Sequence, residues 1–378
     1  MKILYFYPEN PLNKNQGNNA RALQLLYYFK NKNIEVDFVG VESREFKNSQ
    51  IINLKKIGLV AQGYLLPQYK RSKNKIDYFL NYSLPDKLGK RISNLDRTRD
   101  CHINAFNDIL NNNEYEFIII SYAYWSSLIE NNPNVKNSKL IVDTHDFLTS
   151  QFQNSKRFNI GNYFEKEISS LNLFNSVFVV SVEEQYIFSQ FLENRVELIS
   201  HFLEDKSNTL KSSLYDIIYV ASDNEHNLKS ARWFFDKVYN FLNPELKILV
   251  VGKIGKHIKK YKNVEKIEFV ENLDEYYSVS KIAICPMLSG TGVKIKVIEA
   301  LSFGIPVVCN ERGIDGLSNK TNNGCLVTNN PMEFANFIQK LHQDSVFYEI
   351  HSENAKQFFK ENHYISNTYS KLDKVFGL

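Results

Sequence analysis

The C-terminal half of the sequence contains the stretch Pro286-Met-Leu-Ser-Gly-Thr-Gly-Val-Lys-Ile-Lys-Val-Ile-Glu-Ala-Leu-Ser-Phe-Gly-Ile-Pro-Val-Val308. An apolar run over Ile282–Cys285 precedes it and predicts a strand. The stretch itself predicts a glycine-rich turn, a helix over Gly292–Phe303 and a strand over Pro306–Cys309. Glycines let the backbone approach a ligand, and a helix N-terminus offers free N–H groups and the positive end of a dipole. The stretch therefore has the local features of a diphosphate site.

Three charged side chains follow the glycines at helical spacing. We expect Lys294 and Lys296 to lie in the first helical turns, where either could neutralise phosphate charge. Glu299 follows Lys296 by one helical turn and shares its face, so its carboxylate could accept hydrogen bonds from ribose hydroxyls. The alternative is an ordinary strand–turn–helix whose glycines serve only the turn and whose charges are solvated.

Short apolar runs of strand length recur throughout the chain. In the N-terminal half, the pattern predicts a strand over Lys2–Tyr7, a helix over Ala20–Phe29 and a strand over Ile34–Val41, which together form a βαβ unit. Three further runs are each followed directly by a polar residue, which is typical of a parallel sheet that binds ligands at its carboxyl edge. These runs are Phe117–Ile120, Leu140–Val142 and Val177–Val180.

A second α/β series fills the C-terminal half. Its predicted strands before the opening stretch are Asp216–Ala221, Leu246–Val251 and Ile267–Val270, and its predicted helices include Leu228–Leu242 and Pro331–Leu341, with one or two more helices over the last thirty or so residues. The composition turns polar around His201–Ser213, where we place a linker. We therefore expect an N-terminal Rossmann-like domain (1–205), a C-terminal one (214–350), and C-terminal helices (351–378) that could pack back on the first domain.

The composition excludes several classes of protein. The 378 residues are 43% hydrophobic, which suits two soluble domains, and 46 Lys and Arg against 42 Asp and Glu leave too small a positive excess for a nucleic-acid binder. No Asp-x-Asp motif, C-x-x-C pair or cluster with metal-ligand spacing occurs, so we expect neither a metal nor another cofactor. No G-x-G-x-x-G follows a strand, which argues against a dinucleotide oxidoreductase.

The sequence also bears on location. No signal peptide and no apolar run near the roughly 18 residues of a membrane span is seen, so we expect a cytoplasmic protein, at most peripheral at the inner face of the membrane. The stretch Tyr64–Lys75 mixes aromatic and basic residues. It could be a solvated helix and loop, or a patch for anionic lipid headgroups or a charged acceptor.

The opening stretch resembles the donor-binding signature of the retaining glycosyltransferase family four, among the glycosyl transferases group 1. The matching elements are Gly290-Thr-Gly292, Glu299-Ala300 and Gly304-Ile-Pro-Val-Val308. The resemblance implies an α/β protein of GT-B architecture, in which the parallel sheets of two Rossmann-like domains face an interdomain cleft. It also implies that Glu299 holds the nucleotide ribose and that the glycine-rich loop Ser289–Gly292 holds the diphosphate.

The resemblance extends over most of the chain. Gly17-Asn-Asn-Ala-Arg21 looks like the family's first glycine motif beside the donor phosphate, and Asp143-Thr-His-Asp146 looks like its strand-end histidine near the acceptor. Ser181–Glu184 and Tyr219–Asn227 resemble the next strand end and the start of the C-terminal domain. The assigned residues are, for catalysis, His145, Lys296 and Glu299; for donor binding, Gly17, Asn18, Ser222, Asn227, Ser289, Gly290, Thr291, Gly292 and Lys294; and on the acceptor side, Asp143 and Asp146.

The chain departs from the family pattern in two places. Many members have a second glutamate that would fall at Thr291, and many have an Arg and a Lys within the stretch that is Ser222–Asn227 here. Lys294 and Lys296 could replace that pair. His145 could instead be a structural histidine paired to a neighbouring aspartate, and Gly17 could serve only a turn. We expect the other seven histidines, His226 among them, to lie on the surface.

The resemblance implies transfer of a hexosyl unit from a nucleoside diphosphate sugar, UDP first and GDP second, to a hydroxyl of a glycan or lipid-linked glycan. It implies retention of anomeric configuration, and the family points to surface polysaccharide or glycoconjugate biosynthesis. Absence of an Asp-x-Asp motif agrees with metal-independent chemistry. The alternatives are a sugar-nucleotide epimerase of the same fold and a non-catalytic nucleotide-sugar-binding partner of another transferase.

Overall fold

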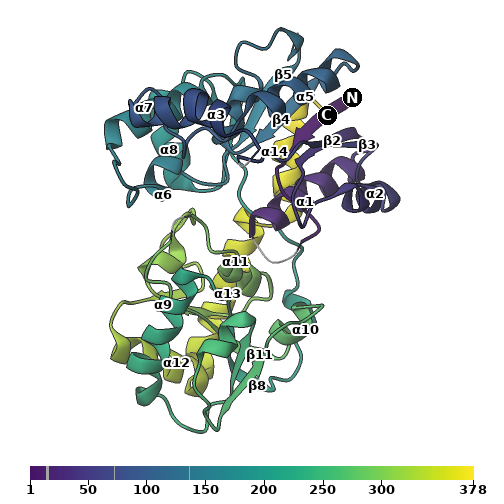
Figure 1. The fold of residues 1–378 in the computed structure, drawn as a ribbon. Coiled ribbons are helices and arrows are strands. Elements are labelled where there is room, and N and C mark those ends of the chain that lie inside the picture. Colours follow the sequence, from purple (N-terminus) through teal and green to yellow (C-terminus); the bar gives the residue numbers. More distant parts are fainter. Residues whose placement is uncertain (14–16, 72, 136, 291) are drawn as a thin grey trace. The chain divides into compact units, whose positions relative to one another are not determined.

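The computed structural model describes residues 1–13, 17–71, 73–135, 137–290 and 292–378. It divides the chain into two compact units, Met1–Leu198 and Ile199–Leu378, each built around one parallel sheet with helices packed on it (Figure 1). The predicted class, two Rossmann-like α/β domains, is confirmed. Among the described residues, no helix combines the length and the apolar character that crossing a membrane requires.

The N-terminal unit has a seven-stranded sheet in the order β3-β2-β1-β4-β5-β6-β7, with every pair parallel. Its strands are β1 (Lys2–Phe6), β2 (Glu35–Val41), β3 (Gln62–Leu66), β4 (Phe117–Ser121), β5 (Lys139–Asp143), β6 (Ser176–Val179) and β7 (Arg195–Leu198). All five residues of β4 are buried, because helices cover both faces of the central strands.

The helices of the N-terminal unit begin with α1 (Gly17–Asn31), which connects β1 to β2. The others are α2 (Asn48–Lys56), α3 (Lys75–Asp77), the π-helical η1 (Tyr78–Ser83), α4 (Leu84–Lys87), α5 (Asp100–Asn111), the 3₁₀ helices η2 (Ala123–Leu128) and η3 (Pro133–Val135), α6 (Leu148–Gln151), α7 (Ile160–Leu171) and α8 (Val182–Phe191).

The C-terminal unit has a six-stranded parallel sheet in the order β10-β9-β8-β11-β12-β13. Its strands are β8 (Tyr215–Val220), β9 (Ile248–Val251), β10 (Val264–Ile267), β11 (Ser280–Cys285), β12 (Val307–Cys309) and β13 (Cys325–Val327). Ile217 and Tyr219 of β8 belong to one hydrophobic cluster and Ile218 to another. Because successive side chains of a strand point to opposite faces, both faces of this sheet are buried.

The helical elements of the C-terminal unit are η4 (Ser207–Thr209), α9 (Glu225–Trp233), η5 (Phe234–Val238), η6 (Tyr239–Phe241), η7 (Lys253–His257), α10 (Asp274–Tyr277), α11 (Ile295–Ser302), η8 (Glu311–Ile314), α12 (Pro331–Gln343), α13 (Ser345–Asn362) and α14 (Ile365–Phe376). The predicted helix over Leu228–Leu242 is thus split into α, π and 3₁₀ segments. Most helical elements of this unit contribute side chains to the two hydrophobic clusters, and η4 and α14 are the exceptions.

The structure corrects the prediction mainly at sheet edges. β3 includes Tyr64–Leu66, the start of the stretch Tyr64–Lys75, for which no strand was predicted. β10 ends at Ile267, where the predicted strand began, and β7 and β13 were not identified. Edge strands are half exposed and tolerate polar residues, which hides them among loops. Helix α11 begins at Ile295 rather than Gly292, because Gly290 and Gly292 have φ of 99° and 74° and Lys294 is extended.

Strand order reverses once in each sheet. In the N-terminal unit β1 lies between β2 and β4, and in the C-terminal unit β8 lies between β9 and β11. In open parallel sheets, ligands bind outside the carboxyl ends of the strands at such a reversal. The connections from the two neighbouring strands there pass to opposite faces of the sheet and leave a crevice between them. Each unit therefore has one preferred place for a ligand.

Candidate functional site

The glycine-rich turn of the C-terminal unit lies between β11 and α11. Gly290 takes a positive φ of 99°, and a Cβ added there would lie 3.4 Å from the ring of His226. The Nδ1 atom of His226 lies 2.9 Å from the Oγ of Ser289, so this histidine ties α9 to the turn. His226 is exposed, as expected, yet its bond to the turn was not foreseen. The predicted site residue Thr291 lies outside the described residues.

Two lysines follow the turn. Lys294 is the residue before α11, and its Nζ donates to the carbonyl oxygen of Gly292 at 2.5 Å. Lys296, in the first turn of α11, donates from Nζ to the Oδ1 of Asn227 at 3.0 Å and lies 5.8 Å from the ring centre of Tyr219. Burial lowers the pKa of both lysines, because removal from water penalises their charged form.

Asn227 connects Lys296 to the end of β8. Its backbone N–H donates to the Oδ1 of Asn224, which caps the N-terminus of α9. Its side-chain Nδ2 donates to the Oγ of Ser222 at 3.1 Å, while its Oδ1 accepts from Lys296. Three predicted residues from two segments, Ser222, Asn227 and Lys296, thus form one hydrogen-bonded chain.

Glu299 lies one turn after Lys296 on α11. The hydroxyl of Tyr277 donates to the Oε2 of Glu299 at 3.3 Å and lies 3.2 Å from the backbone oxygen of Lys296. Burial raises the pKa of Glu299, whereas the bond from Tyr277 and the charges of Lys206 and Lys296 act in the opposite direction. Tyr277 was not predicted, and one tyrosine among 22 carries no signal in the sequence.

In the N-terminal unit, Asp143 joins two of the predicted segments. The Nε of Arg21, on α1, donates to both carboxylate oxygens of Asp143 at 2.8 and 2.9 Å, and the Nε2 of His145 lies 3.1 Å from Oδ2. Burial alone would raise the pKa of Asp143, but the charge of Arg21 and the contact with His145 bring it well below its usual range. Asp143 is fully buried, so it acts on its surroundings through Arg21 and His145.

His145 and Tyr122 share an unusual backbone geometry. Their φ angles are 61° and 68°, in the left-handed region that bulky residues avoid, and their rings stack with centroids 4.4 Å apart. The Nδ2 of Asn18 donates to the hydroxyl of Tyr122 at 2.6 Å, and Gly17 begins α1 beside it. Strained residues persist where the surrounding structure fixes them, and they concentrate at functional sites. Tyr122, which follows β4 directly, is a site residue that the sequence analysis missed.

Buried carboxylates follow His145. Glu184 accepts from the hydroxyl of Thr144 at 3.3 Å, and burial together with the charge of Asp146 raises its pKa to about 7. Glu167 caps α6 by accepting from the backbone N–H of Leu148 at 2.8 Å, and burial raises its pKa also to about 7. Asp146 is half-buried beside them. In the described part of the chain, no group of three or more His, Cys, Asp or Glu could hold a metal ion.

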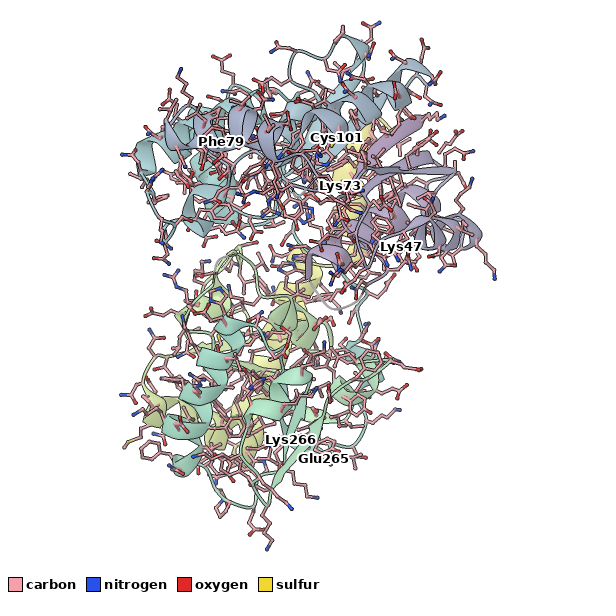
Figure 2. The ribbon with its side chains drawn as sticks, viewed as in Figure 1. Lys47, Lys73, Phe79, Cys101, Glu265 and Lys266 are labelled. Atoms are coloured by element: carbon pink, nitrogen blue, oxygen red, sulfur yellow. The ribbon has the colours of Figure 1, made fainter. Side chains whose placement is uncertain are left out.

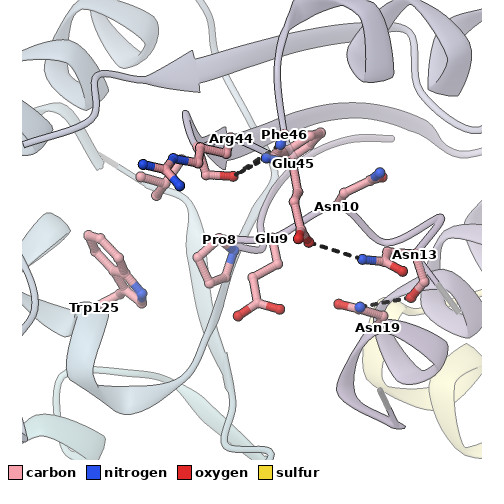
Figure 3. A pocket seen from close by; sticks show the side chains of 11 residues that line it. Pro8, Glu9, Asn10, Asn13, Asn19, Arg44, Glu45, Phe46 and Trp125 are labelled. Carbon is pink, nitrogen blue, oxygen red and sulfur yellow. Dashed lines mark hydrogen bonds between the residues drawn. The ribbon is translucent and has the colours of Figure 1, made fainter. Parts of the chain in front are cut away.

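A pocket of about 440 Å³ opens beside the carboxyl ends of β1 and β2 (Figure 3). Its volume lies within the range of about 300–1,000 Å³ that is usual for small-molecule sites. The buried Nε1 of Trp125 has no hydrogen-bond partner among the described residues. The lining residues are Pro8, Glu9, Asn10, Asn13, Asn19, Val41, Ser43, Arg44, Glu45, Phe46 and Trp125. Carboxylates and amides of this kind suit a ligand rich in hydroxyl groups.

The expectation that the remaining histidines lie on the surface is wrong for three of them. His102, His201 and His363 are at most 6% exposed. The Nδ1 of His363 lies 2.8 Å from the backbone oxygen of His201, and burial lowers the pKa of His363 to about 4. These imidazoles pack in the interior. For His102, the helical spacing to Phe106, Ile109 and Leu110, which share its buried face of α5, is a signal that the sequence carries.

Comparison with known proteins places these observations in a family context. Residues 215–344 match the family model described as glycosyl transferases group 1. An uncharacterized 44.6 kDa protein in the cps region of Klebsiella pneumoniae is 23% identical over an alignment of 293 residues that covers 70% of this chain and 74% of that protein.

Solved structures match the whole chain. Sucrose-phosphate synthase from Thermosynechococcus elongatus has a TM-score of 0.72 at 14% identity, covering 100% of this chain and 98% of that one. Anabaena HepE in complex with UDP-glucose has a TM-score of 0.69 at 14% identity, covering 100% and 99%. The chain therefore has the GT-B fold of two Rossmann-like domains, and its residues 215–344 match the glycosyl transferases group 1 family.

Proposed function

We propose that this chain is a glycosyltransferase that moves a hexosyl unit from a nucleoside diphosphate sugar to a hydroxyl of a glycan or lipid-linked glycan. UDP is our first choice of nucleotide and GDP the second. We further propose that the reaction retains the anomeric configuration, needs no metal ion, and serves surface polysaccharide or glycoconjugate biosynthesis at the inner face of the membrane. The match to glycosyl transferases group 1, the fold shared with HepE bound to UDP-glucose, and the relative in a cps region support this proposal.

The observation that carries the proposal is the position of Lys296. Its ammonium group lies at the N-terminus of α11, where burial lowers its pKa, and its hydrogen-bond partner is the neutral oxygen of Asn227. Among the described residues it forms no ion pair. A diphosphate would supply the missing negative charge, and the N–H groups of the helix end would bind its oxygens.

The remaining donor-site residues extend this arrangement. Lys294 and the turn Ser289–Gly292 would hold the phosphate oxygens, and Glu299, oriented by Tyr277, would accept from the ribose hydroxyls. Ser222 would hold Asn227, and through it Lys296, in position. In the N-terminal unit, Gly17 and Asn18 would approach the donor phosphate, and His145 would bind a sugar hydroxyl beside Asp146.

We propose attack on the same face of the sugar, with no covalent intermediate on the protein. The acceptor hydroxyl forms the new bond to the anomeric carbon while the bond to the diphosphate oxygen breaks, and the leaving phosphate takes the proton of the hydroxyl. The protein contributes positioning and stabilisation of the leaving charge.

A thermal-shift titration tests the donor site. UDP, GDP, ADP, CMP and their sugars are compared with and without EDTA, and a ligand at 100 times its Kd should stabilise the folded state by about 2.7 kcal/mol. We expect a shift with UDP or GDP that EDTA leaves unchanged and that Lys296→Met abolishes. Lys229→Ala, which removes an exposed cation of α9, is the matched control. If no nucleotide shifts the transition, the donor site is wrongly assigned.

Product analysis separates the alternatives. A free epimerised nucleotide sugar formed without an acceptor would identify an epimerase, and nucleotide-sugar binding without turnover on any acceptor would identify a non-catalytic partner. Formation of a glycosylated acceptor with the donor's anomeric configuration would support the transferase.

A further inference from the structure

A helical segment of the N-terminal unit leaves one apolar face uncovered. The 75–88 segment consists of α3, η1, α4 and the residue Leu88 that ends α4. Its large exposed apolar side chains are between 36% and 78% exposed, and they are Ile76, Phe79, Leu80, Leu84 and Leu88. Their spacing of three to four residues places them on one side of the helical segment. Tyr82, on the other side, is the one buried residue of these three helices.

Contacts of its opposite side fix this segment on the unit. The hydroxyl of Tyr82 accepts from the backbone N–H of Asp100 at 3.1 Å, and the guanidinium carbon of Arg99 lies 4.2 Å from the ring centre of Tyr82. Arg91 lies 4.6 Å from the same ring, and Arg71 lies 4.2 Å from the ring of Tyr78. The apolar face is therefore held in place by the structure around Tyr82.

Positive charge surrounds this face. Residues 70–90 contain six Lys or Arg and two Asp, which gives a formal net charge of +4, and the whole chain has the same net charge of +4. The rest of the protein is therefore neutral overall, and the excess is local. The exposed cations of this segment are Lys70, Arg71, Lys73, Lys75, Lys87 and Lys90, and Figure 2 labels Lys73 together with Phe79.

We propose that the 75–88 segment and its cations form a docking surface for an anionic lipid bilayer. The five apolar side chains would enter the boundary between headgroups and acyl chains, and the cations would bind the anionic headgroups. Five lysines on this surface favour lipid over a protein partner, because protein interfaces are depleted in lysine. The inference rests on these side chains and not on the proposed transfer reaction.

Vesicle flotation of the full chain tests the surface. Vesicles of neutral phosphatidylcholine are compared with vesicles that contain 40% phosphatidylglycerol, at ionic strengths of 0.1 and 0.5 M. We expect the partition ratio to be at least tenfold higher on anionic vesicles and to fall with salt. One cation near an anionic surface changes partitioning by about fivefold, so Lys73→Glu/Lys75→Glu should lower binding by about 25-fold or more. Phe79→Ser/Leu80→Ser should lower it by about tenfold.

Matched variants on the other unit serve as controls. Lys259→Glu/Lys260→Glu reverses two exposed cations, and Val346→Ser removes an apolar side chain that is 69% exposed. Both should bind vesicles like the unchanged protein. Equal binding to neutral and anionic vesicles, no binding to either, or unchanged binding by the folded 73/75 variant would overturn the proposal. So would a dimer, seen by sedimentation, that Phe79→Ser/Leu80→Ser disperses. The nucleotide shift, measured on the same variants, reports separately on the donor site.

Discussion

At the carboxyl end of β5, buried Asp143 is paired with Arg21 and His145, whereas at the start of α11 Lys296 is bonded to the neutral amide of Asn227. The first charge is compensated within its own unit, and the second has no ion-pair partner among the described residues. A compensated charge fixes neighbouring elements in place and needs no ligand of opposite charge. An uncompensated cation in a partly buried position is stabilised when an anion binds, so the same physical chemistry that maintains the N-terminal unit indicates a binding site in the C-terminal unit.

The largest expected effect comes from breaking the compensated charge. Arg21→Met leaves the carboxylate of Asp143 buried without its cation, and loss of one partner of a buried pair costs about 3–5 kcal/mol. Lys296→Met, in contrast, removes a cation that has no counter-charge and should leave stability unchanged or raise it slightly. Urea unfolding of both variants measures the free energies. If Lys296→Met lost more stability than Arg21→Met, the comparison between the two charges would be wrong.

The second effect concerns turnover. Lys296→Met should lower kcat by about 10²–10³-fold, the cost of removing one donor that stabilises a developing negative charge. Its melting temperature without nucleotide should not fall, which separates function from folding. Lys229→Ala should turn over like the unchanged protein. Full activity in the Lys296→Met variant would remove this residue from the site.

The smallest effect is a dependence of stability on pH. It adds to the comparison a third buried group, the carboxyl group of Glu184. Glu184 forms no ion pair with a cation in the described part of the chain, and burial and the charge of Asp146 raise its pKa from 4.5 to about 7. The folded state therefore binds more protons than the unfolded state between about pH 4.5 and 7, and the stability from Glu184 is present at the lower pH and lost as the pH rises through 7.

Glu184→Gln keeps the shape of the protonated acid and should remove this dependence. We expect the variant to exceed the unchanged protein in stability by about 1–3 kcal/mol at pH 8 and to match it near pH 4.5. Urea unfolding from pH 4.5 to 8 provides the measurement. Parallel stability curves for the two proteins would mean that Glu184 stays ionised throughout.

The sequence was sufficient for the sheet centres and insufficient at their edges. Runs such as Phe117–Ile120 are apolar because helices cover both faces of the strand, and this composition is visible without a structure. In β10, the consecutive residues Glu265 and Lys266 are exposed, and two adjacent charges between single apolar residues resemble a loop. The predicted strand was therefore placed three residues too late.

The candidate site was partly predictable for a related reason. Ser222, Asn227 and Lys296 were selected by motif, and the structure brings them together. Tyr277 and Tyr122 belong to the site because of their geometry. Tyr277 places its hydroxyl near Glu299, and Tyr122 has a strained backbone beside His145. Neither property has a signature in residue type or spacing, so sequence reasoning could not separate them from the tyrosines of the core.

The parallel order of both sheets has a consequence for how the chain is made. Adjacent parallel strands cannot form from hairpins, and Ile3 of β1 pairs with Phe117 of β4, so the central pairing must wait for a long section of chain. Because the units are contiguous, all strands of Met1–Leu198 exist before β8 is synthesised. At about 5–20 residues per second, the first unit has a lead of about 10–40 s over the second. Synthesis on the ribosome thus separates two slow folding events in time, whereas refolding from denaturant starts both together and exposes the unpaired strands of each to the other.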